Sequence, residues 1–307
     1  MKLAPITVFC YNRLDNLKVT INALQNNLLA VESDLIIFSD GPKNIKDDLL
    51  VKNVREFLNT ITGFKSIAIH LSAENKGLAN SIIEGVEHVL NVYDTIIVLE
   101  DDVKTSRNFL LFMNSALNKY QSNEKVFSIS GYSYPFKKST DILDGFFLPR
   151  LCSFAWATYK RSWQNVNWKS QAIFTSNYAN SKKFKKEFNV GGSDLFGLLK
   201  KDEASKINSW AIRWSYHQML NKGLTFYPRM SKVQNIGFEK EATNSNTFNK
   251  YFSDLDDGIS EGFLLPDEVQ VDSYYLNQLQ QFYSLKNRLI NRLKTYLVSL
   301  NIIKNRI

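Results

Sequence analysis

Three consecutive acids, Glu100, Asp101 and Asp102, are the residues of this sequence best suited to bind a metal ion. They directly follow the apolar run at 95–99, which is typical of a buried strand. Open α/β sheets bind ligands at the carboxyl ends of their strands. Adjacent carboxylates repel, and Mg²⁺ or Mn²⁺ compensates them with one or two carboxylates plus substrate phosphates. The alternative is a solvated acidic turn that favours the N-terminus of the next helix.

Polar residues also follow two other strand-like runs. Tyr11, Asn12 and Arg13 come after the run at 6–10, and Asp40 comes after the second such run. We expect the first group to hold the base or the phosphate of a nucleotide donor. The guanidinium of Arg13 suits a diphosphate, because it forms two parallel hydrogen bonds. A carboxylate suits the imide N–H of uracil. The alternatives are a capping loop for the first group and a turn residue for Asp40.

The tripeptide Asn75-Lys76-Gly77 precedes an amphipathic helix. A helix N-terminus entered through glycine is a generic anion site, so we expect Lys76 to contact an anionic ligand; an ordinary loop is the alternative. The sequence contains no P-loop, no Gly-x-Gly-x-x-Gly fingerprint and no Gly-x-Ser-x-Gly elbow. This argues against a P-loop NTPase, a Rossmann dehydrogenase and a serine hydrolase.

Strand-like and helical runs alternate through the first 130 residues. The predicted strands lie at 6–10, 35–38, 66–71, 95–99 and 126–130. The predicted helices lie at about 14–28, 51–58, 78–89 and 109–120. Because these strands are apolar throughout, we expect an α/β fold with a mostly parallel sheet and helices on both faces. We divide the chain into a nucleotide-binding half at 1–135, an acceptor-binding half of strand-like and loop-like pieces at 136–272, and a helical tail at 273–307.

The formal net charge of +8 favours anionic partners such as nucleotides or phospholipids. Nucleic acid is not expected, because no zinc-finger, RRM or KH signature occurs. Two cysteines outside any CxxC pattern fit a reducing cytosol, and neither a signal peptide nor a transmembrane run of about 18 apolar residues is seen. We therefore expect a cytoplasmic protein.

The segment 284–307 carries a leucine stripe interspersed with lysine and arginine. Such a helix suits an anionic lipid surface, which predicts a peripheral association with the inner face of the membrane. The alternatives are that the stripe packs on the protein's own core or on another subunit.

The motifs above are similar to those of the GT-A glycosyltransferases over residues 4–265. The start of the chain resembles the family 2-like bacterial sugar transferases. The part at 75–130, with its Glu-Asp-Asp motif, resembles the N-acetylglucosaminyltransferase I-like group. The stretch at 208–235 resembles bacterial members of that group, which often act in surface polysaccharide synthesis.

The resemblance implies a GT-A fold, which is a Rossmann-like mixed sheet flanked by helices. It also implies a metal-dependent, inverting transfer from UDP-GlcNAc or a UDP-hexose to a glycan or a lipid-linked glycan. The roles that it assigns are Mn²⁺ or Mg²⁺ binding for Asp102, ribose or donor sugar for Glu100 and Asp101, and phosphate and uracil for Arg13 and Asp40. A segment at 237–249 would close over the donor.

One departure concerns the catalytic base. The animal enzymes of the group place an Asp between two tryptophans, whereas Trp210 and Trp214 here enclose no acid. Asp194 is our candidate for the base, because it follows two glycines and such a loop can approach a substrate closely. Glu203 and Glu239 are alternatives, and Asp194 as an ordinary helix N-cap is another.

Two other classes of protein stay open. A nucleotidyltransferase that makes an NDP-sugar would share the α/β fold and the acidic metal site, but it usually begins with a Gly-rich phosphate loop, which is absent after 6–10. A non-catalytic module that binds a nucleotide or glycan is favoured by the missing acid between the tryptophans.

Overall fold

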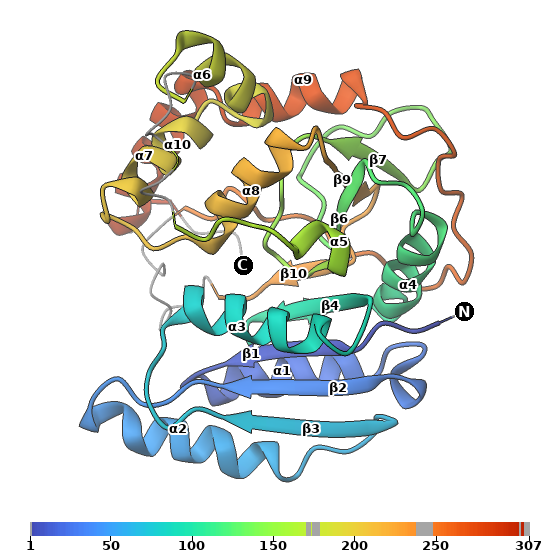
Figure 1. Ribbon diagram of the computed structural model, residues 1–307, viewed down its shortest axis with the longest axis vertical. Helices are drawn as coiled ribbons and strands as arrows, with labels where there is room; N and C mark the ends of the chain where they lie inside the picture. Colours follow the sequence, from blue (N-terminus) through green and yellow to red (C-terminus); the bar gives the residue numbers. More distant parts are fainter. Residues whose placement is uncertain (1, 170–172, 174–178, 238–247, 301, 304–307) are drawn as a thin grey trace.

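The computed structural model describes residues 2–169, 173, 179–237, 248–300 and 302–303. One eight-stranded sheet forms its centre, in the order β3-β2-β1-β4-β8-β6-β9-β7, with helices on both faces (Figure 1). The predicted α/β fold class, a mostly parallel sheet flanked by helices with a C-terminal helical part, is confirmed.

Four parallel strands make the first half of the sheet. They are β1 Ile6–Cys10, β2 Asp34–Ser39, β3 Ser66–Leu71 and β4 Thr95–Glu100. Strand β1 is buried along its whole length and β4 along its centre, as apolar strands covered on both faces must be. Parallel pairing brings the carboxyl ends of β2, β1 and β4 together at one edge of the sheet.

Strands from both sides of residue 135 complete the same sheet. Its further strands are β6 Val126–Ser130, β7 Gly145–Leu148, β8 Trp156–Tyr159 and β9 Leu224–Pro228. Strand β8 is antiparallel to both of its neighbours and β7 is antiparallel to β9, whereas β6 and β9 are parallel. The two halves of the chain that we distinguished at residue 135 therefore share one sheet.

The helices divide between the two faces of the sheet. Their bounds are α1 Leu14–Gln25, α2 Ile45–Leu58, α3 Leu78–Leu90, α4 Phe109–Lys119, α5 Lys160–Trp163, α6 Lys182–Phe188, α7 Leu195–Glu203, α8 Trp210–Leu220, α9 Ser273–Phe282 and α10 Leu285–Ser299, with short 3₁₀ turns at Ala30–Glu32 and Asn189–Gly191. Helices α1, α2 and α4 pack in one hydrophobic cluster, and α3 and α8 pack in a second one on the other face.

The region at 136–272 is more helical than we expected, because it contains α6, α7 and α8. Helix α8 has no clear amphipathic stripe. Its Trp210 and Trp214 are buried against α3, while Ile212 is buried in a third cluster together with α6 and α7. A helix buried on two sides loses the 3.6-residue alternation by which helices are identified, and its aromatic residues favour strands by propensity.

All five tryptophans of the chain gather in one aromatic cluster. The rings of Trp156 and Trp214 lie 4.7 Å apart, and those of Trp163 and Trp168 lie 4.6 Å apart. Trp168 alone among them is not fully buried. These large aromatic side chains therefore form part of the core.

A buried ion pair joins the stretch between β9 and β10 to the segment that follows β10. The Nζ of Lys232 is buried and lies 2.9 Å from Oδ2 of Asp256, whose Oδ1 accepts a hydrogen bond from Asn108. Burial by itself raises the pKa of Asp256, but the hydrogen bond and charge of Lys232 outweigh it, so that this pKa is below its ordinary value.

This lowered pKa predicts a pH-dependent stability. The pair stabilises the fold above the ordinary pKa of an Asp, near 4, and the contribution disappears as the pH falls through the lowered pKa. At pH 7 we expect Asp256→Asn to reduce the free energy of unfolding by about 3 kcal/mol, since it leaves a buried ammonium unpaired. Urea denaturation at pH 7 and at pH values below the lowered pKa measures the difference, and a constant difference would contradict the prediction.

Candidate nucleotide and metal site

The acidic turn, which we define as Glu100-Asp101-Asp102, lies where β4 ends, beside the ends of β1 and β2. The backbone N–H of Tyr11 donates to Oδ2 of Asp101 at 3.2 Å. The Nη1 of Arg13 lies 3.5 Å from Oδ2 of Asp102. The structure thus brings the residues predicted after β1 together with the three acids.

Burial, and after it the repulsion between neighbouring carboxylates, disfavours the ionised forms of Glu100 and Asp101. Burial, followed by the charges of Asp102 and Asp101, raises the pKa of Glu100 well above its ordinary value. Burial and then Asp102 raise the pKa of Asp101 to about 7, and burial raises the pKa of Asp102 against the opposing charge of Arg13. A divalent cation would relieve this repulsion, and its preferred ligands are oxygens like these.

A strand from the second half of the chain completes the site. Strand β10 (Val233–Asn235) pairs antiparallel with β5 (Val103–Thr105), which follows the acidic turn directly. The backbone N–H of Ile236 donates to the carbonyl of Asp102 at 2.9 Å, and Nδ2 of Asn235 lies 3.5 Å from Oδ1 of Asp102. A Cβ at Gly237 would collide with the carboxylate of Asp102, so only glycine leaves this carboxylate its place.

The residues present fit a hard divalent cation. Among the residues that the structure describes, no three His, Cys, Asp or Glu side chains come close enough together to hold a metal ion. Mg²⁺ does not require such a cage, because it retains waters and takes one or two carboxylates plus substrate phosphates. Asp102 is the carboxylate nearest to Arg13, and its side chain is 16% exposed, so it remains accessible to a ligand.

Thr20 of α1 fixes the backbone of the acidic turn. Its hydroxyl is buried, donates to the carbonyl of Asp101 at 2.9 Å and accepts the N–H of Val103 at 3.1 Å. Sequence reasoning missed this residue, because nothing distinguishes its place in the helix from that of other polar residues.

We expect Thr20→Val to reduce the free energy of unfolding by about 1–3 kcal/mol, because it leaves a buried N–H and a carbonyl without partners. Thr20→Ser retains the hydroxyl and should lose much less. Chemical denaturation of the two variants measures this, and equal stabilities would show that the hydroxyl does not fix the turn.

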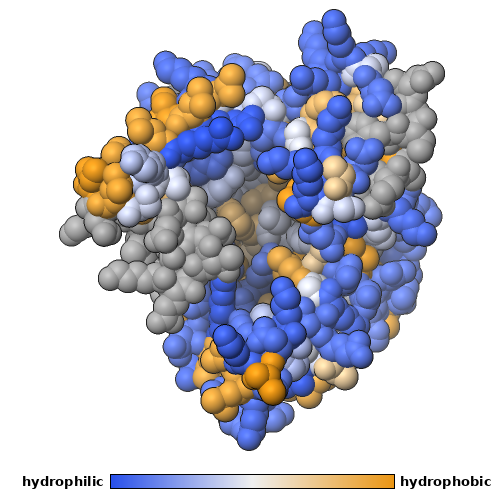
Figure 2. Space-filling view, turned by 90° about the vertical axis from the view of Figure 1, so that its left-hand side faces the viewer, coloured by the Kyte–Doolittle hydropathy of each residue, from blue (hydrophilic) through white to orange (hydrophobic). Residues whose placement is uncertain are grey.

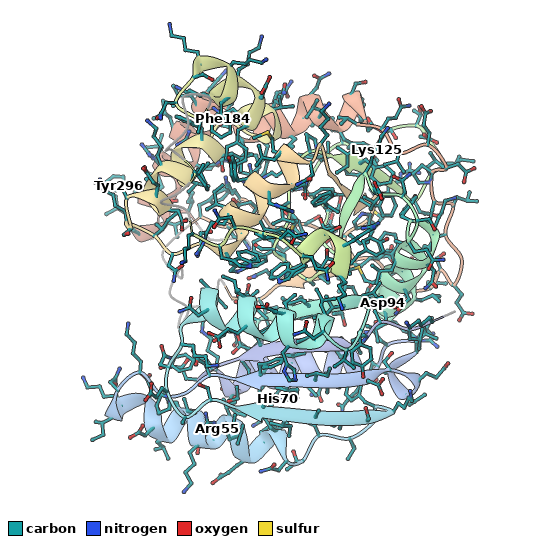
Figure 3. The ribbon with its side chains drawn as sticks, in the orientation of Figure 1. Arg55, His70, Asp94, Lys125, Phe184 and Tyr296 are labelled. Atoms are coloured by element: carbon teal, nitrogen blue, oxygen red, sulfur yellow. The ribbon has the colours of Figure 1, made fainter. Side chains whose placement is uncertain are left out.

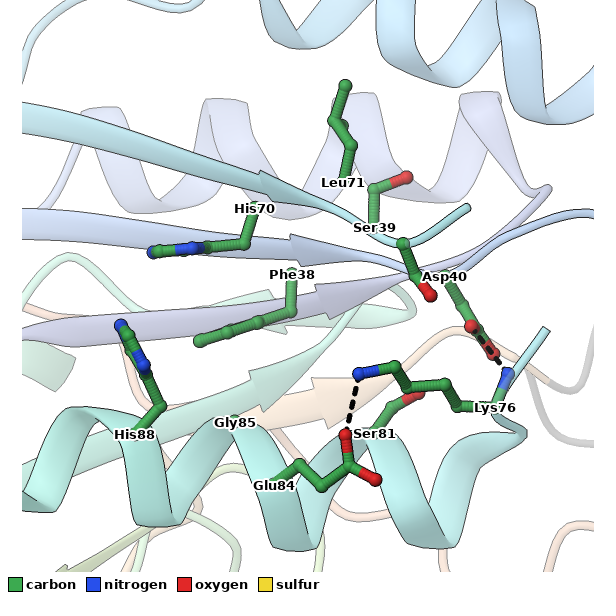
Figure 4. Close-up of a pocket in the computed structure, with 11 residues that line it drawn as sticks. Phe38, Ser39, Asp40, His70, Leu71, Lys76, Ser81, Glu84, Gly85 and His88 are labelled. Carbon is green, nitrogen blue, oxygen red and sulfur yellow. Dashed lines mark hydrogen bonds and ion pairs between the residues drawn. The ribbon is translucent and has the colours of Figure 1, made fainter. Parts of the chain in front are cut away.

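Asp40 holds the neighbouring loop together. Its Oδ1 accepts the backbone N–H of Lys76 at 2.9 Å (Figure 4). The same oxygen accepts the N–H of Gly41 at 2.9 Å, and Oδ2 accepts that of Gly77 at 3.0 Å. The helix N-terminus at which we expected an anionic ligand therefore already receives the carboxylate of Asp40. Since a carboxylate offers about four lone-pair sites, one remains for a ligand such as the imide of uracil.

Arg55 of α2 stabilises the same loop through hydrogen bonds to its backbone. Its Nη2 donates to the carbonyls of Asp40 at 3.2 Å and Ser72 at 2.6 Å, which lie after the ends of β2 and β3. A Cβ at Gly41 would collide with the backbone of Glu74, so the two loops touch directly. These loops therefore form one preassembled wall of the site.

A pocket opens between this wall and the acidic turn. Tyr11, Asp40, Glu100 and Asp101, all predicted donor-binding residues, line it together with Phe38. The hydroxyl of Tyr11 accepts the N–H of Lys43 at 3.0 Å, which fixes the ring at the rim. Aromatic rings beside hydrogen-bonding groups are what a nucleoside needs.

Two predicted donor-binding side chains make other contacts in this structure. The Nδ2 of Asn12 donates to Asp47 at 3.0 Å. The Nζ of Lys76 pairs with Glu84 at 2.6 Å in a second pocket next to the first (Figure 4). The ring of Phe38 lines both pockets and stacks between Phe9 and His70, so it forms the partition between them.

Asp194, the candidate base, lies in an ion pair. Its two oxygens accept hydrogen bonds from Nη1 and Nη2 of Arg150 at 2.9 and 3.0 Å. The guanidinium of Arg150 lies 3.6 Å from the ring centroid of Tyr283, and its Nη1 also donates to the carbonyl of Gly191. The Asp194 side chain makes no capping hydrogen bond to α7. Both oxygens are thus engaged in an anchor between α7, the end of α9 and the segment after β7.

Of the other residues considered for the base, Glu203 is the last residue of α7, and Glu239 lies outside the described residues. The segment at 237–249, expected to close over the donor, is described only at its ends.

No protein-family model matches the chain, and no curated protein matches it in sequence. Among solved structures, the chain is similar to TarS of S. aureus, with 10% sequence identity and a TM-score of 0.37. The match covers 73% of this chain and 36% of TarS, so the chain spans only about a third of that protein. It is also similar to the mannosyltransferase PcManGT from Pyrobaculum calidifontis, solved in complex with GDP-Man and Mn²⁺, with 9% identity, a TM-score of 0.39, and 71% and 74% of the two chains covered. Both likenesses are distant, and the interpretation of the site rests on this chain's own residues.

Proposed function

We propose that this protein is a divalent-metal-dependent glycosyltransferase whose donor is a UDP-sugar, UDP-GlcNAc or a UDP-hexose. The observation that carries the proposal is the acidic turn at the carboxyl end of β4, beside Arg13 and next to a nucleoside-sized pocket. The carboxylates of the acidic turn suit a metal ion. The guanidinium of Arg13, 3.5 Å from Asp102, suits the diphosphate beside it.

Each residue has a distinct part in the proposed reaction. Asp102 would hold Mn²⁺ or Mg²⁺, and the metal would neutralise the charge of the diphosphate leaving group. Arg13 places a second positive charge at the phosphates, while Glu100 and Asp101 face the ribose or the donor sugar. The remaining acceptor site of Asp40 receives the uracil imide. A hydroxyl of the glycan acceptor would attack the anomeric carbon with inversion, so that the bond to the diphosphate breaks and UDP leaves. A carboxylate of the protein would take up the proton of that hydroxyl. The product would belong to surface polysaccharide synthesis.

Calorimetry on the wild-type protein tests the proposal, with UDP, GDP and CMP each titrated in the presence and absence of Mn²⁺. We expect UDP to bind only with Mn²⁺ and more tightly than the other two nucleotides. Binding of GDP alone would replace the uridine donor by a guanosine one. If no nucleotide binds under either condition, the acidic turn is only a turn and the proposal fails.

A non-catalytic nucleotide- or glycan-binding module is the second candidate. Two observations favour it: Trp210 and Trp214 enclose no acid, and Asp194 is held in an ion pair by Arg150. Such a module would bind UDP without releasing it from any UDP-sugar, whatever acceptor is added. Release of pyrophosphate from UTP and a sugar phosphate would instead identify a nucleotidyltransferase.

A further inference from the structure

Helix α10 exposes most of its large apolar residues, whereas a helix packed on its own protein buries them. Its large apolar residues face solvent: Leu285 is 66% exposed, Leu289 54%, Leu293 59%, Tyr296 60% and Leu300 49%. With 100° between successive residues, these five positions lie within an arc of about 80°. Figure 3 shows Tyr296 at the outer edge of the molecule.

The inward side of the same helix is mixed, because Leu297 and Val298 are partly buried there beside polar residues. Asn287 and Thr295 are partly buried, the Nδ2 of Asn287 donates to the carbonyl of Gln281, and Oγ1 of Thr295 accepts the N–H of Phe248. No residue of α10 is buried. The exposed leucines of the stripe therefore do not pack on the protein's own core, whereas Leu297 is partly buried.

The charge of the helix is of one sign. Lys286, Arg288, Arg292 and Lys294 are its charged residues, and it contains no Asp or Glu. Arg288 and Arg292 lie along one border of the apolar arc and Lys286 lies just beyond the other. This is the arrangement of helices that lie in the interface of an anionic bilayer. A second copy of the chain would bring an equally positive helix against this one, so charge complementarity favours lipid over self-association.

The helix also faces the side of the molecule on which the candidate site opens. In Figure 1, α10 and the carboxyl ends of β2 and β3 lie on the same side. Figure 2 looks onto that side, where a hydrophobic patch at the upper left adjoins hydrophilic residues and the surface is hollowed between the two parts of the molecule. Among the described helices, none is long and apolar enough to cross a membrane.

We propose that α10 is a docking surface for an anionic lipid bilayer, in which it lies in the plane of the headgroups with Leu285, Leu289, Leu293, Tyr296 and Leu300 inserted. This inference does not depend on the proposed glycosyl transfer. If both hold, docking presents the candidate site to acceptors carried on lipids.

Cosedimentation of the full-length protein with phosphatidylcholine vesicles, with and without phosphatidylglycerol, tests the proposal. We expect binding to the anionic vesicles alone, and binding that weakens as salt is added. Leu289→Asn combined with Leu293→Asn should weaken it by at least about tenfold, because two leucine side chains no longer leave water. Arg288→Gln combined with Arg292→Gln should weaken it and flatten its dependence on salt.

Val31→Asn combined with Val92→Asn is the matched control, because these valines are 70% and 77% exposed and belong to other surfaces. All variants should retain the far-UV spectrum and any nucleotide binding of the wild type, which separates a failure of docking from a failure of the proposed function. Unchanged sedimentation of the leucine variant, or equal binding to neutral vesicles, would overturn the proposal. So would a dimer in analytical ultracentrifugation that the leucine substitutions dissociate.

Discussion

Asp102→Asn is expected to abolish Mn²⁺-dependent binding of UDP while the protein remains folded. The side chain of Asp102 is enclosed by Arg13, Asn235 and the backbone of Gly237, so an amide of the same shape fits the same space. It lacks the charge that a divalent cation requires. The loss should be at least about 100-fold in affinity, since even groups outside the metal's own ligands are worth 10–100-fold.

The same substitution should not destabilise the protein, and this distinguishes loss of a ligand from loss of the fold. Burial raises the pKa of Asp102, so its ionised form is disfavoured in the folded state and costs stability at pH 7. Asp102→Asn removes that cost, and the free energy of unfolding without metal should rise or stay constant. Asp15→Asn, at an exposed acid in the first turn of α1, is the control. Metal-dependent UDP binding that survives in Asp102→Asn would refute the assignment of the metal.

Asp194→Ala is expected to reduce the free energy of unfolding by about 3–5 kcal/mol, because it leaves the buried guanidinium of Arg150 without its carboxylate. Arg150→Met should cost a similar amount for the reciprocal reason. The double variant Arg150→Met with Asp194→Leu should recover much of the loss, since a buried ion pair replaced by apolar groups of similar volume is often nearly neutral.

Thermal and chemical denaturation of the three variants measure this effect. Glu56→Ala provides the control, since it removes an exposed partner of Lys52 and should change the stability by less than about 1 kcal/mol. If Asp194 is instead the catalytic base, Asp194→Asn would leave the stability intact and abolish turnover. That outcome would contradict the anchoring role.

The fold class and the heart of the site follow from local sequence patterns. The apolar runs that became β1 and β4 are each bounded by polar residues, and the next residues after them, Tyr11 and Asp101, meet through a hydrogen bond. Parallel pairing makes this proximity predictable, because strand ends coincide at one edge. The donor sugar, the uridine and the kinship with the N-acetylglucosaminyltransferase I-like group remain predictions.

Other parts of the site depend on contacts that no local pattern encodes. The carboxylate of Asp40 meets N–H groups of a loop 36 and 37 residues away, and Arg55 meets the same loop from a helix. The ion pair between Asp194 and Arg150 is equally non-local, so the sequence around Asp194 does not reveal it. The two preceding glycines alone suggested a base in a loop close to the substrate. On α10 the amphipathic pattern was visible in the sequence, but which side faces the protein is decided by tertiary packing.

The pairing of β10 with β5 has a consequence for how the protein matures. Asn235 pairs with Val103 in this ladder, and its side chain reaches Asp102, which is 133 residues away in the chain. Contacts of such long sequence separation form late in folding, and domains emerge from the ribosome N-terminus first. A nascent chain that has already assembled its first four strands therefore still lacks the second side of the candidate site. If this site binds a nucleotide-sugar donor as we propose, the growing polypeptide acquires that ability only after β10 has been synthesised.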